Sequence, residues 1–223
     1  VDDICALINE LCSGIENKKL LGIGVGVVGP IDKNKGVILN PINFPASGWE
    51  NVPIRKLLEE RTGLETYVEN GANAAALGEH LKGAGKGVGN MAYITAGVGL
   101  RLGLITNGRL VETTNGSIGG FGHLTVDSNG VNCYCRSNDC LETYVSIPAV
   151  LKSFKSGLEN YRSLSDTEKA AENMNSISFD AFCDAVENHD PLANEIIERA
   201  AKYFSVGLSA IINIVAPELI VLG

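Results

Sequence analysis

Three of the six cysteines lie within eight residues, and this cluster constrains the chain more than any other feature. They are Cys133, Cys135 and Cys140, and nine residues separate His123 from the first of them. Three thiolates and one imidazole suit a closed tetrahedral zinc site, in which no position is open for a catalytic water. The spacing therefore predicts a structural zinc ion held by His123, Cys133, Cys135 and Cys140. The alternative is a set of buried cysteines beside an unrelated histidine.

The composition indicates a globular chain in a reducing compartment. Hydrophobic residues make up 45% of the 223 residues and charged residues 20%, and no apolar run approaches the ~20 residues of a membrane span. We therefore expect a cytoplasmic protein without a membrane partner. Cys5, Cys12 and Cys183 are scattered and are interpreted as small core residues. The formal net charge of −8 leaves no basic footprint, so any DNA-reading segment must lie upstream of this chain.

Apolar periodicity predicts alternating strands and helices, which favours α/β architecture. The Asn107-Gly108 pair is a strong hairpin signal. Strands are expected at residues 20–28, 36–39, 66–69, 91–95, 102–105 and 218–222, helices at 2–16, 53–61, 72–81, 140–154, 178–187 and 191–215, and a polar connector at 156–175.

Several motifs, in order along nearly the whole chain, resemble the ROK family (repressors, open reading frames and sugar kinases). The zinc signature matches in the run from Gly122-His123 through Cys133-x-Cys135-x4-Cys140-Leu-Glu142. The stretches that also match are Gly22-Ile-Gly-Val-Gly with Gly29-Pro-Ile-Asp32, Asn40-Pro-Ile-Asn43 with Gly48-Trp49, Val68-Glu-Asn70 with Ala74–Glu79, and Tyr93–Gly97 with Asn107–Leu110.

The resemblance implies an actin/hexokinase-like (ribonuclease H-like) two-lobed α/β fold with a zinc-binding loop, truncated here at both ends. The expected lobes are residues 1–76, lacking the first strands, and 77–223 with the zinc loop. It also implies a homodimer that binds a small sugar between its lobes through Asn70, His123 and Glu142. Asn70 has the alternative role of a helix cap, and Glu142 that of a carboxylate favourable near a helix N-terminus.

In the zinc loop the chain departs from the family pattern only at non-ligand positions, Arg136 and Asp139, where the family prefers glycine. The other departures affect the sugar and phosphate sites. Gly71 stands where family kinases place the catalytic aspartate, and Gly120 replaces a sugar-binding glutamate. In the phosphate loop, Val98 lacks a hydroxyl and Arg101 adds bulk where glycine would let backbone amides approach a phosphate. The family's other phosphate loop, DxGGT, would precede residue 1. Because phosphoryl transfer depends on positioning and charge stabilisation, ATP binding and catalysis are not expected.

Three functions follow from this resemblance. The favoured one is the sugar-sensing effector domain of a ROK-type transcriptional regulator with a degenerate kinase site. The alternative is a ROK-family sugar kinase that phosphorylates a hexose or N-acetylhexosamine with ATP, and the third is a zinc-stabilised pseudokinase that binds only protein partners. On the residues alone, Arg101 is interpreted as a solvated hairpin arginine, with contact to a phosphate or an acidic partner as the alternative.

Overall fold

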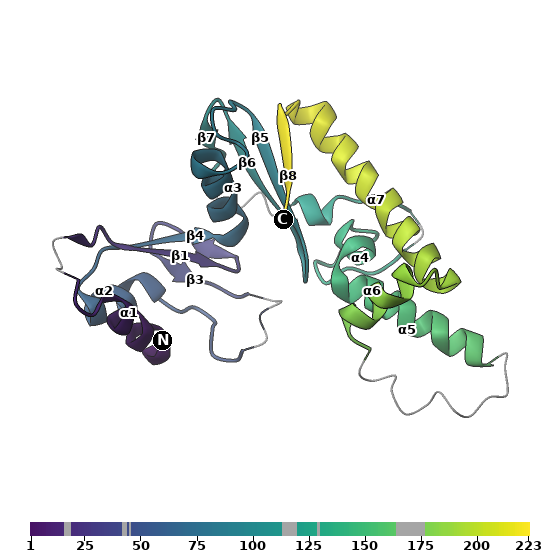
Figure 1. Ribbon diagram of the computed structural model, residues 1–223, viewed down its shortest axis with the longest axis horizontal. Helices are drawn as coiled ribbons and strands as arrows, with labels where there is room; N and C mark the ends of the chain where they lie inside the picture. Colours follow the sequence, from purple (N-terminus) through teal and green to yellow (C-terminus); the bar gives the residue numbers. More distant parts are fainter. Residues whose placement is uncertain (16–18, 42–43, 45, 113–119, 129, 164–176) are drawn as a thin grey trace. The chain divides into compact units, whose positions relative to one another are not determined.

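The computed structural model describes residues 1–15, 19–41, 44, 46–112, 120–128, 130–163 and 177–223, with the backbone alone at 161–163 (Figure 1). The chain forms two compact units. The first comprises Val1–Tyr93, the described part of 102–118 and Glu218–Val221, and the second comprises Ile94–Arg101, the described part of 119–217 and Leu222–Gly223. These units do not coincide with the expected lobes, 1–76 and 77–223, which remain a prediction.

The first unit begins with an α/β arrangement around one hydrophobic core. Strand β1 (Ile23–Val27) pairs in parallel with β4 (Thr66–Asn70), and β2 (Ile31–Asp32) forms an antiparallel pair with β3 (Val37–Ile38). Helices α1 (Asp2–Cys12) and α2 (Ile54–Thr62) contribute to the core. The fully buried residues of that core are Cys5, Ile38, Ile54, Leu58 and Val68.

Helix α3 (Gly71–Lys82) packs against a four-stranded sheet with the order β7-β6-β5-β8. The strands are β5 (Met91–Ala96), β6 (Leu100–Thr106), β7 (Arg109–Leu110) and β8 (Leu219–Leu222). A Cβ atom on Gly103 would lie 2.5 Å from the Ala72 carbonyl oxygen, so glycine permits the close approach of helix and strand. The expected hairpin forms at Asn107 and Gly108, whose φ angles of 52° and 72° fit a type I′ turn.

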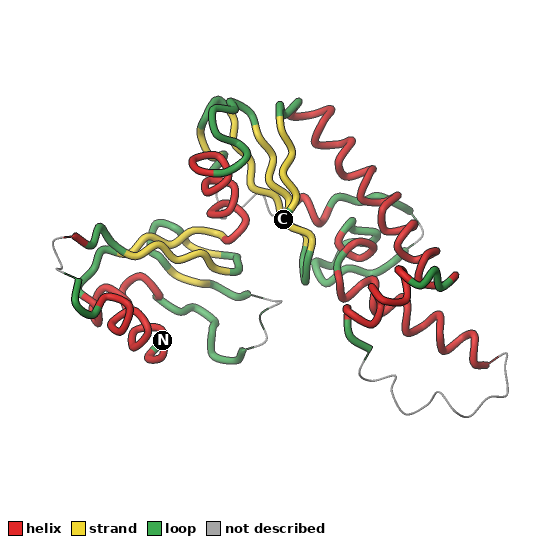
Figure 2. Tube along the Cα trace, viewed as in Figure 1, coloured by secondary structure: helices red, strands yellow, loops and turns green. Residues whose placement is uncertain are grey.

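The second unit is largely helical in the residues described (Figure 2). A 3₁₀ turn at Phe121–His123 precedes α4 (Glu142–Val145), α5 (Ile147–Ser163), α6 (Phe179–Glu187) and α7 (Pro191–Val215). Ser178 and Asp190 cap α6 and α7 with their side chains. The buried core of α5, α6 and α7 consists of Val150, Phe154, Phe182, Ala193, Ile196 and Ala200. Among the described helices, none combines the length and apolar character needed to cross a membrane.

Most expected elements form, and the exceptions have local causes. The helix expected at 140–154 is two helices, because Ser146 adopts an extended backbone (ψ 152°) before Pro148. The expected connector 156–175 is helical up to Ser163, and residues 164–176 lie outside the described chain. Helix α1 ends at Cys12, two residues before Gly14 takes a φ of 82°. The expected buried strand 20–28 is instead half-buried at alternate residues of β1.

Candidate metal centre and adjoining ligand site

A short folded loop, residues 130–141, brings the three clustered cysteines together, and we call it the metal-ligand loop. Its backbone folds back on itself through hydrogen bonds from Cys133 N–H to the Ser137 carbonyl (2.9 Å) and from Asp139 N–H to the Val131 carbonyl (2.7 Å). The end of the loop is tied to the segment after His123, because Leu141 N–H donates to the Leu124 carbonyl (2.8 Å). Residues far apart in the sequence therefore meet at one point.

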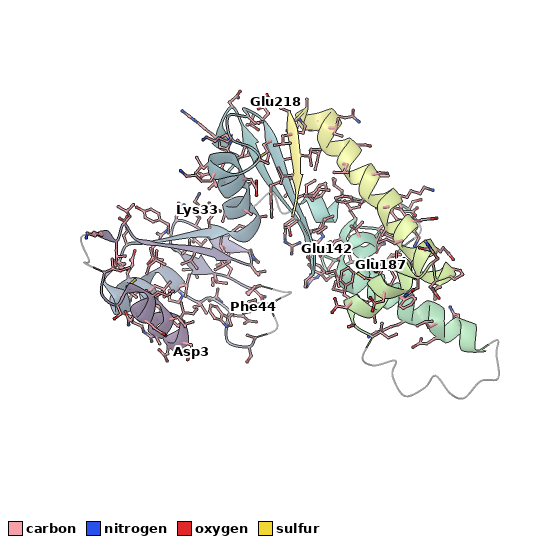
Figure 3. All side chains as sticks on the ribbon, in the orientation of Figure 1. Asp3, Lys33, Phe44, Glu142, Glu187 and Glu218 are labelled. Atoms are coloured by element: carbon pink, nitrogen blue, oxygen red, sulfur yellow. The ribbon has the colours of Figure 1, made fainter. Side chains whose placement is uncertain are left out.

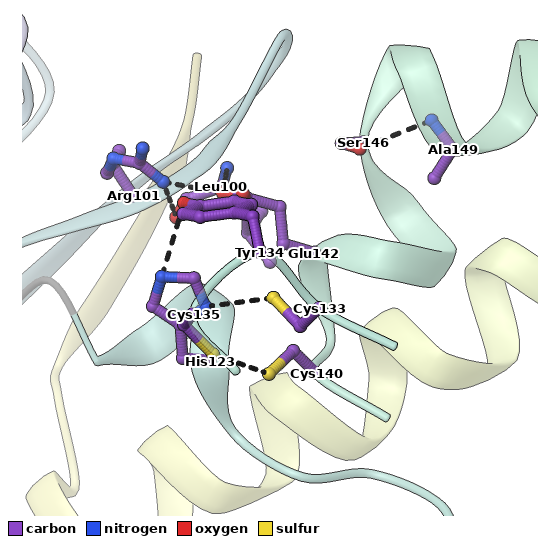
Figure 4. Close-up of polar contacts among 10 residues, drawn as sticks. All are labelled: Leu100, Arg101, His123, Cys133, Tyr134, Cys135, Cys140, Glu142, Ser146 and Ala149. Atoms are coloured by element: carbon purple, nitrogen blue, oxygen red, sulfur yellow. Dashed lines mark hydrogen bonds and ion pairs between the residues drawn. The ribbon is translucent and has the colours of Figure 1, made fainter. Parts of the chain in front are cut away.

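The four predicted ligands converge within this loop. One donor atom from each of His123, Cys133, Cys135 and Cys140 lies within 4.8 Å of all the others, so the cluster could hold a metal ion. His123 Nδ1 is 3.6 Å from Cys133 Sγ, and Cys135 Sγ is 3.6 Å from Cys140 Sγ (Figure 4). Cys133 and Cys140 are buried while Cys135 is exposed. The donor set and its convergence fit the metal site that the spacing predicts.

The thiols of the cluster affect one another's ionisation. Burial and the two neighbouring thiols raise the pKa of Cys140 to about 12, and burial also raises the pKa of Cys133. Backbone hydrogen bonding at Ser137 lowers the pKa of Cys135. Three crowded thiols cannot all ionise favourably by themselves, whereas a bound cation stabilises thiolates. The cluster could therefore hold a cation, which would favour the thiolate forms of the cysteines.

His123 directs its second ring nitrogen away from the thiols. Nε2 lies 3.2 Å from the hydroxyl of Tyr134, and the two rings meet edge to face with their centroids 5.1 Å apart. If Nδ1 is the metal ligand, Nε2–H donates to the Tyr134 oxygen and fixes the ring, as outer partners of metal-bound histidines do. Burial, and then the Glu142 carboxylate, raise the pKa of Tyr134 to about 12.

Asp139 organises the metal-ligand loop. The sequence did not indicate this role, because Asp139 is not one of the predicted metal ligands. Its carboxylate accepts hydrogen bonds from the backbone N–H groups of Gly130 (2.7 Å) and Val131 (2.9 Å) and from the Tyr144 hydroxyl (2.5 Å). These contacts, the tyrosine first, lower the pKa of Asp139. The Tyr144 ring stacks on Tyr203 of α7 with centroids 4.0 Å apart. The metal-ligand loop is thereby attached to the helices beside it.

Two residues of the metal-ligand loop have a left-handed backbone, at the positions where the family resemblance leads us to expect glycine. Arg136 and Asp139 occupy those positions, and their φ angles are 72° and 56°. Glycine adopts this left-handed conformation freely, whereas aspartate tolerates it and arginine does so at a cost of about 1 kcal/mol. The loop path that glycine favours is therefore preserved without glycine.

Glu142, a predicted sugar-binding residue, is the first residue of α4 and is paired inside the protein (Figure 3). Its Oε2 accepts hydrogen bonds from the backbone N–H of Leu100 (2.7 Å) and from Nη1 of Arg101 (2.5 Å). The interpretation of Arg101 as a solvated arginine is therefore wrong. That partnership joins residues 41 apart in the sequence, so no local pattern could have indicated it.

Asn70 lies in the first unit, at the end of β4, and is buried. Its Oδ1 accepts a hydrogen bond from Ala72 N–H (3.0 Å), which confirms the role of helix cap for α3. Its amide nitrogen lies 2.9 Å from the place where a Cβ on Gly29 would stand, so glycine provides the space there. The position of Asn70 is further set by Glu69, whose carboxylate accepts from Asn70 N–H (2.9 Å) and pairs with Lys33 (2.8 Å).

Comparison with known proteins agrees with this fold. The fold is the actin/hexokinase-like α/β fold of solved ROK kinases and of a ROK regulator. The model of the ROK family matches residues 1–223, and the chain belongs to that family.

Its relatives include both kinases and repressors. The chain is 33% identical to a glucokinase of Halalkalibacterium halodurans over 99% of its own length and 67% of the relative's. It is 31% identical to the xylose repressor of Caldicellulosiruptor bescii over 92% of its own length and 50% of the repressor's. A crystal structure of a ROK family transcriptional regulator, a homologue of the E. coli MLC protein, superposes with a TM-score of 0.80 at 25% identity, covering 100% of this chain and 55% of that one. The chain thus spans about half the length of the regulators it matches.

Proposed function

We propose that this chain is the sugar-sensing effector region of a ROK-type transcriptional regulator whose kinase site has degenerated. The observation that carries the proposal is Gly71. It is the first residue of α3, directly after the capping Asn70, where family kinases place the carboxylate that accepts the sugar proton. A residue without a side chain cannot act as a general base, and losing one typically costs 10²–10⁴-fold in rate.

The turn between β5 and β6 supports the same proposal. Val98 is 60% exposed and has no hydroxyl, and the Arg101 guanidinium is paired with Glu142. Cradling a phosphate requires accessible backbone N–H groups, yet the Leu100 N–H already donates to Glu142. We therefore expect no productive ATP binding.

The metal in this proposal is a single structural zinc ion. The ligands would be His123, Cys133, Cys135 and Cys140, a set that leaves no open coordination position. Its role would be to fix the conformation of the metal-ligand loop. The His123 imidazole and the N-terminus of α4 would thereby be held in position to contact a sugar. The small-molecule partner would be a sugar that contacts Asn70, His123 and Glu142.

The sugar kinase remains a second candidate, because one relative is a glucokinase that matches 99% of the chain at 33% identity. Production of ADP from ATP with a panel of hexoses and N-acetylhexosamines separates the two functions. The regulator proposal expects no sugar-dependent ADP, whereas turnover near a typical enzyme's ~10 s⁻¹ would establish the kinase. The third candidate, a pseudokinase that binds only proteins, requires that no sugar alter the melting temperature.

Other parts of the proposal concern the whole protein. A helix-turn-helix segment upstream of Val1 would supply DNA binding, which this chain of net charge −8 is not suited to provide. The homodimer and the cytoplasmic location stay predictions. Sequencing the gene upstream of Val1 tests the DNA-binding segment directly.

A further inference from the structure

The pair formed by Arg101 and Glu142 changes what the second unit can offer to a ligand. Arg101 is the second residue of β6, and Glu142 is the first residue of α4. The guanidinium Nη1 lies 2.5 Å from the carboxylate Oε2 (Figure 4). The same Nη1 donates to the Leu100 carbonyl (3.0 Å), while Leu100 N–H donates to the same carboxylate oxygen (2.7 Å). Oε2 therefore accepts two strong hydrogen bonds from within the protein.

The two partners differ in exposure. The Glu142 side chain is 5% exposed and the Arg101 side chain 23%. Burial lowers the pKa of the guanidinium, but the adjacent carboxylate outweighs this effect and raises it, so Arg101 remains charged. A ligand that approaches this pair consequently meets the cation first, and the anion lies behind it.

Two glycines lie beside the carboxylate. A Cβ on Gly99 would lie 3.0 Å from Oε2, and a Cβ on Gly122 would lie 3.2 Å from it. Glycine at both positions avoids a clash with this oxygen, which is buried and already accepts from Leu100 and Arg101. A neutral sugar binds through hydroxyl groups that need acceptors, whereas a guanidinium offers only donors.

We propose that Arg101 determines the ligand class of this site, and that it selects a sugar bearing a phosphate or carboxylate group over the corresponding neutral sugar. The inference rests on the proposed sensing function and names the chemistry of its ligand. The anionic group would pair with the exposed edge of the guanidinium, where charge-assisted hydrogen bonds are strongest. The sugar hydroxyls would form hydrogen bonds with neighbouring polar groups, one of which is the Tyr134 hydroxyl.

The test is calorimetry and thermal shift on the purified protein with matched ligands: glucose, glucose 6-phosphate and glucuronate, and the corresponding xylose compounds. Inorganic phosphate is titrated separately, because free phosphate could supply the same anion without a sugar. We expect an anionic sugar to bind at least about tenfold more tightly than its neutral counterpart. Inorganic phosphate alone should bind more weakly than the sugar phosphate.

Two variants assign this preference to the proposed residue. Arg101→Met keeps the bulk but removes the charge, and it should abolish the preference. A double variant, Arg101→Met with Glu142→Gln, removes both charges and is used if an unpaired Glu142 lowers the melting temperature. Arg109→Met removes an equal charge from the exposed strand β7 and should leave the preference unchanged.

The outcomes separate this inference from the proposed function. Tighter binding of neutral sugars, or an anion preference that survives in both Arg101 variants, would overturn the role of Arg101 while leaving sugar sensing intact. If neither the neutral nor the anionic sugars produce heat or a melting shift, the sensing function fails together with this inference. Binding of inorganic phosphate as tight as that of the sugar phosphate would also overturn it, because the site would then select an anion and not a sugar.

Discussion

Asp139 accepts a 2.5 Å hydrogen bond from the hydroxyl of Tyr144, and this contact joins the metal-ligand loop to α4. Tyr144 in turn stacks on Tyr203, whose hydroxyl is bonded to Asp127. Each of the two stacked tyrosines therefore donates a hydrogen bond to a different carboxylate. An arrangement of this kind holds a ligand-bearing loop in place from outside its set of metal ligands.

Removing one hydroxyl from this arrangement should loosen the metal site. Tyr144→Phe keeps the ring stacking but leaves Asp139 with only its backbone partners. We expect metal affinity to fall by about tenfold or more, as for other outer partners of metal ligands, when it is measured by competition with a chelator. Tyr67→Phe is the matched control, since Tyr67 is 60% exposed in the first unit. Equal metal affinity in the two variants would show that Asp139 does not position the loop.

The metal ligands themselves should determine both metal content and stability. Cys135→Ser is expected to lower zinc from about one ion per chain and to lower the melting temperature, because structural zinc supplies about 10 kcal/mol or more of apparent folding free energy. Cys183→Ser, on α6 and outside the cluster, should change neither quantity greatly. Elemental analysis of protein purified without a chelator provides the measurement, and absence of zinc from the unmodified protein would refute the assignment.

Asn70 has two roles that substitution can separate. Asn70→Ala removes the cap of α3 and should destabilise the protein by about 1 kcal/mol. Asn70→Asp keeps an acceptor for Ala72 N–H but loses the amide donor, so stability should be largely retained while sugar binding weakens. Comparing urea unfolding with calorimetric affinity for the two variants decides the matter. Unchanged sugar affinity in Asn70→Asp would leave only the capping role.

Restoring the two absent carboxylates should not restore a kinase. Among the described residues, the nearest atom to a Cβ on Gly71 would be the Val27 carbonyl oxygen at 3.7 Å, and a Cβ on Gly120 would have none within 4 Å. The variant Gly71→Asp with Gly120→Glu should therefore fold normally. We expect no sugar-dependent ADP in a coupled assay, because Val98 still lacks a hydroxyl and the Leu100 N–H, still bonded to Glu142, cannot cradle the phosphates of ATP. Turnover in this variant would mean that the two carboxylates were all that catalysis lacked.

Gly207 is the position on α7 where a small substitution should be most harmful. A Cβ there would lie 2.4 Å from Leu141 Cδ2 and 3.3 Å from Phe121 Cζ, both on buried side chains beside the metal ligands. Gly207→Ala should cost about 1–3 kcal/mol through overpacking, which corresponds to a decrease in melting temperature of about 2–4 °C for each kcal/mol.

Gly78→Ala on α3 is the control for helix propensity. Apart from the helix's own backbone and the neighbouring residues, no atom of the described chain lies within 4 Å of its Cβ position. Alanine favours the helix by up to about 1 kcal/mol, so this variant should be neutral or stabilising. If Gly207→Ala melts at or above the temperature of the unmodified protein, α7 does not pack as closely on Leu141 as described. Thermal unfolding followed by circular dichroism measures both variants.

The sequence predicts the parts of this protein that depend on neighbouring residues. Helix α7 covers its expected residues and α2 lies within one residue of its expected range, because Gly63 ends α2 in a left-handed conformation and the Asp190 side chain caps α7. The metal cluster was predictable for a similar reason, since three of its four ligands lie within one loop. Arg101 was misinterpreted because its partner, Glu142, belongs to another element 41 residues away. Asp139 was noticed only as a missing glycine, and its three hydrogen bonds depend on how the loop closes.

The left-handed backbone at Arg136 bears on the order in which this protein opens. Arg136 is exposed, and its N–H bonds only within the same turn, to the Cys133 carbonyl (3.0 Å). The left-handed conformation of Arg136 therefore destabilises the turn, and packing at Arg136 does not offset this cost. The folded conformation of the turn depends instead on the cysteines that flank it. Segments with few buried contacts open at low free energy, well before the core does. Amide hydrogen exchange should accordingly begin at residues 134–138 and be fastest when the metal is withdrawn, while α5 and α7 remain protected.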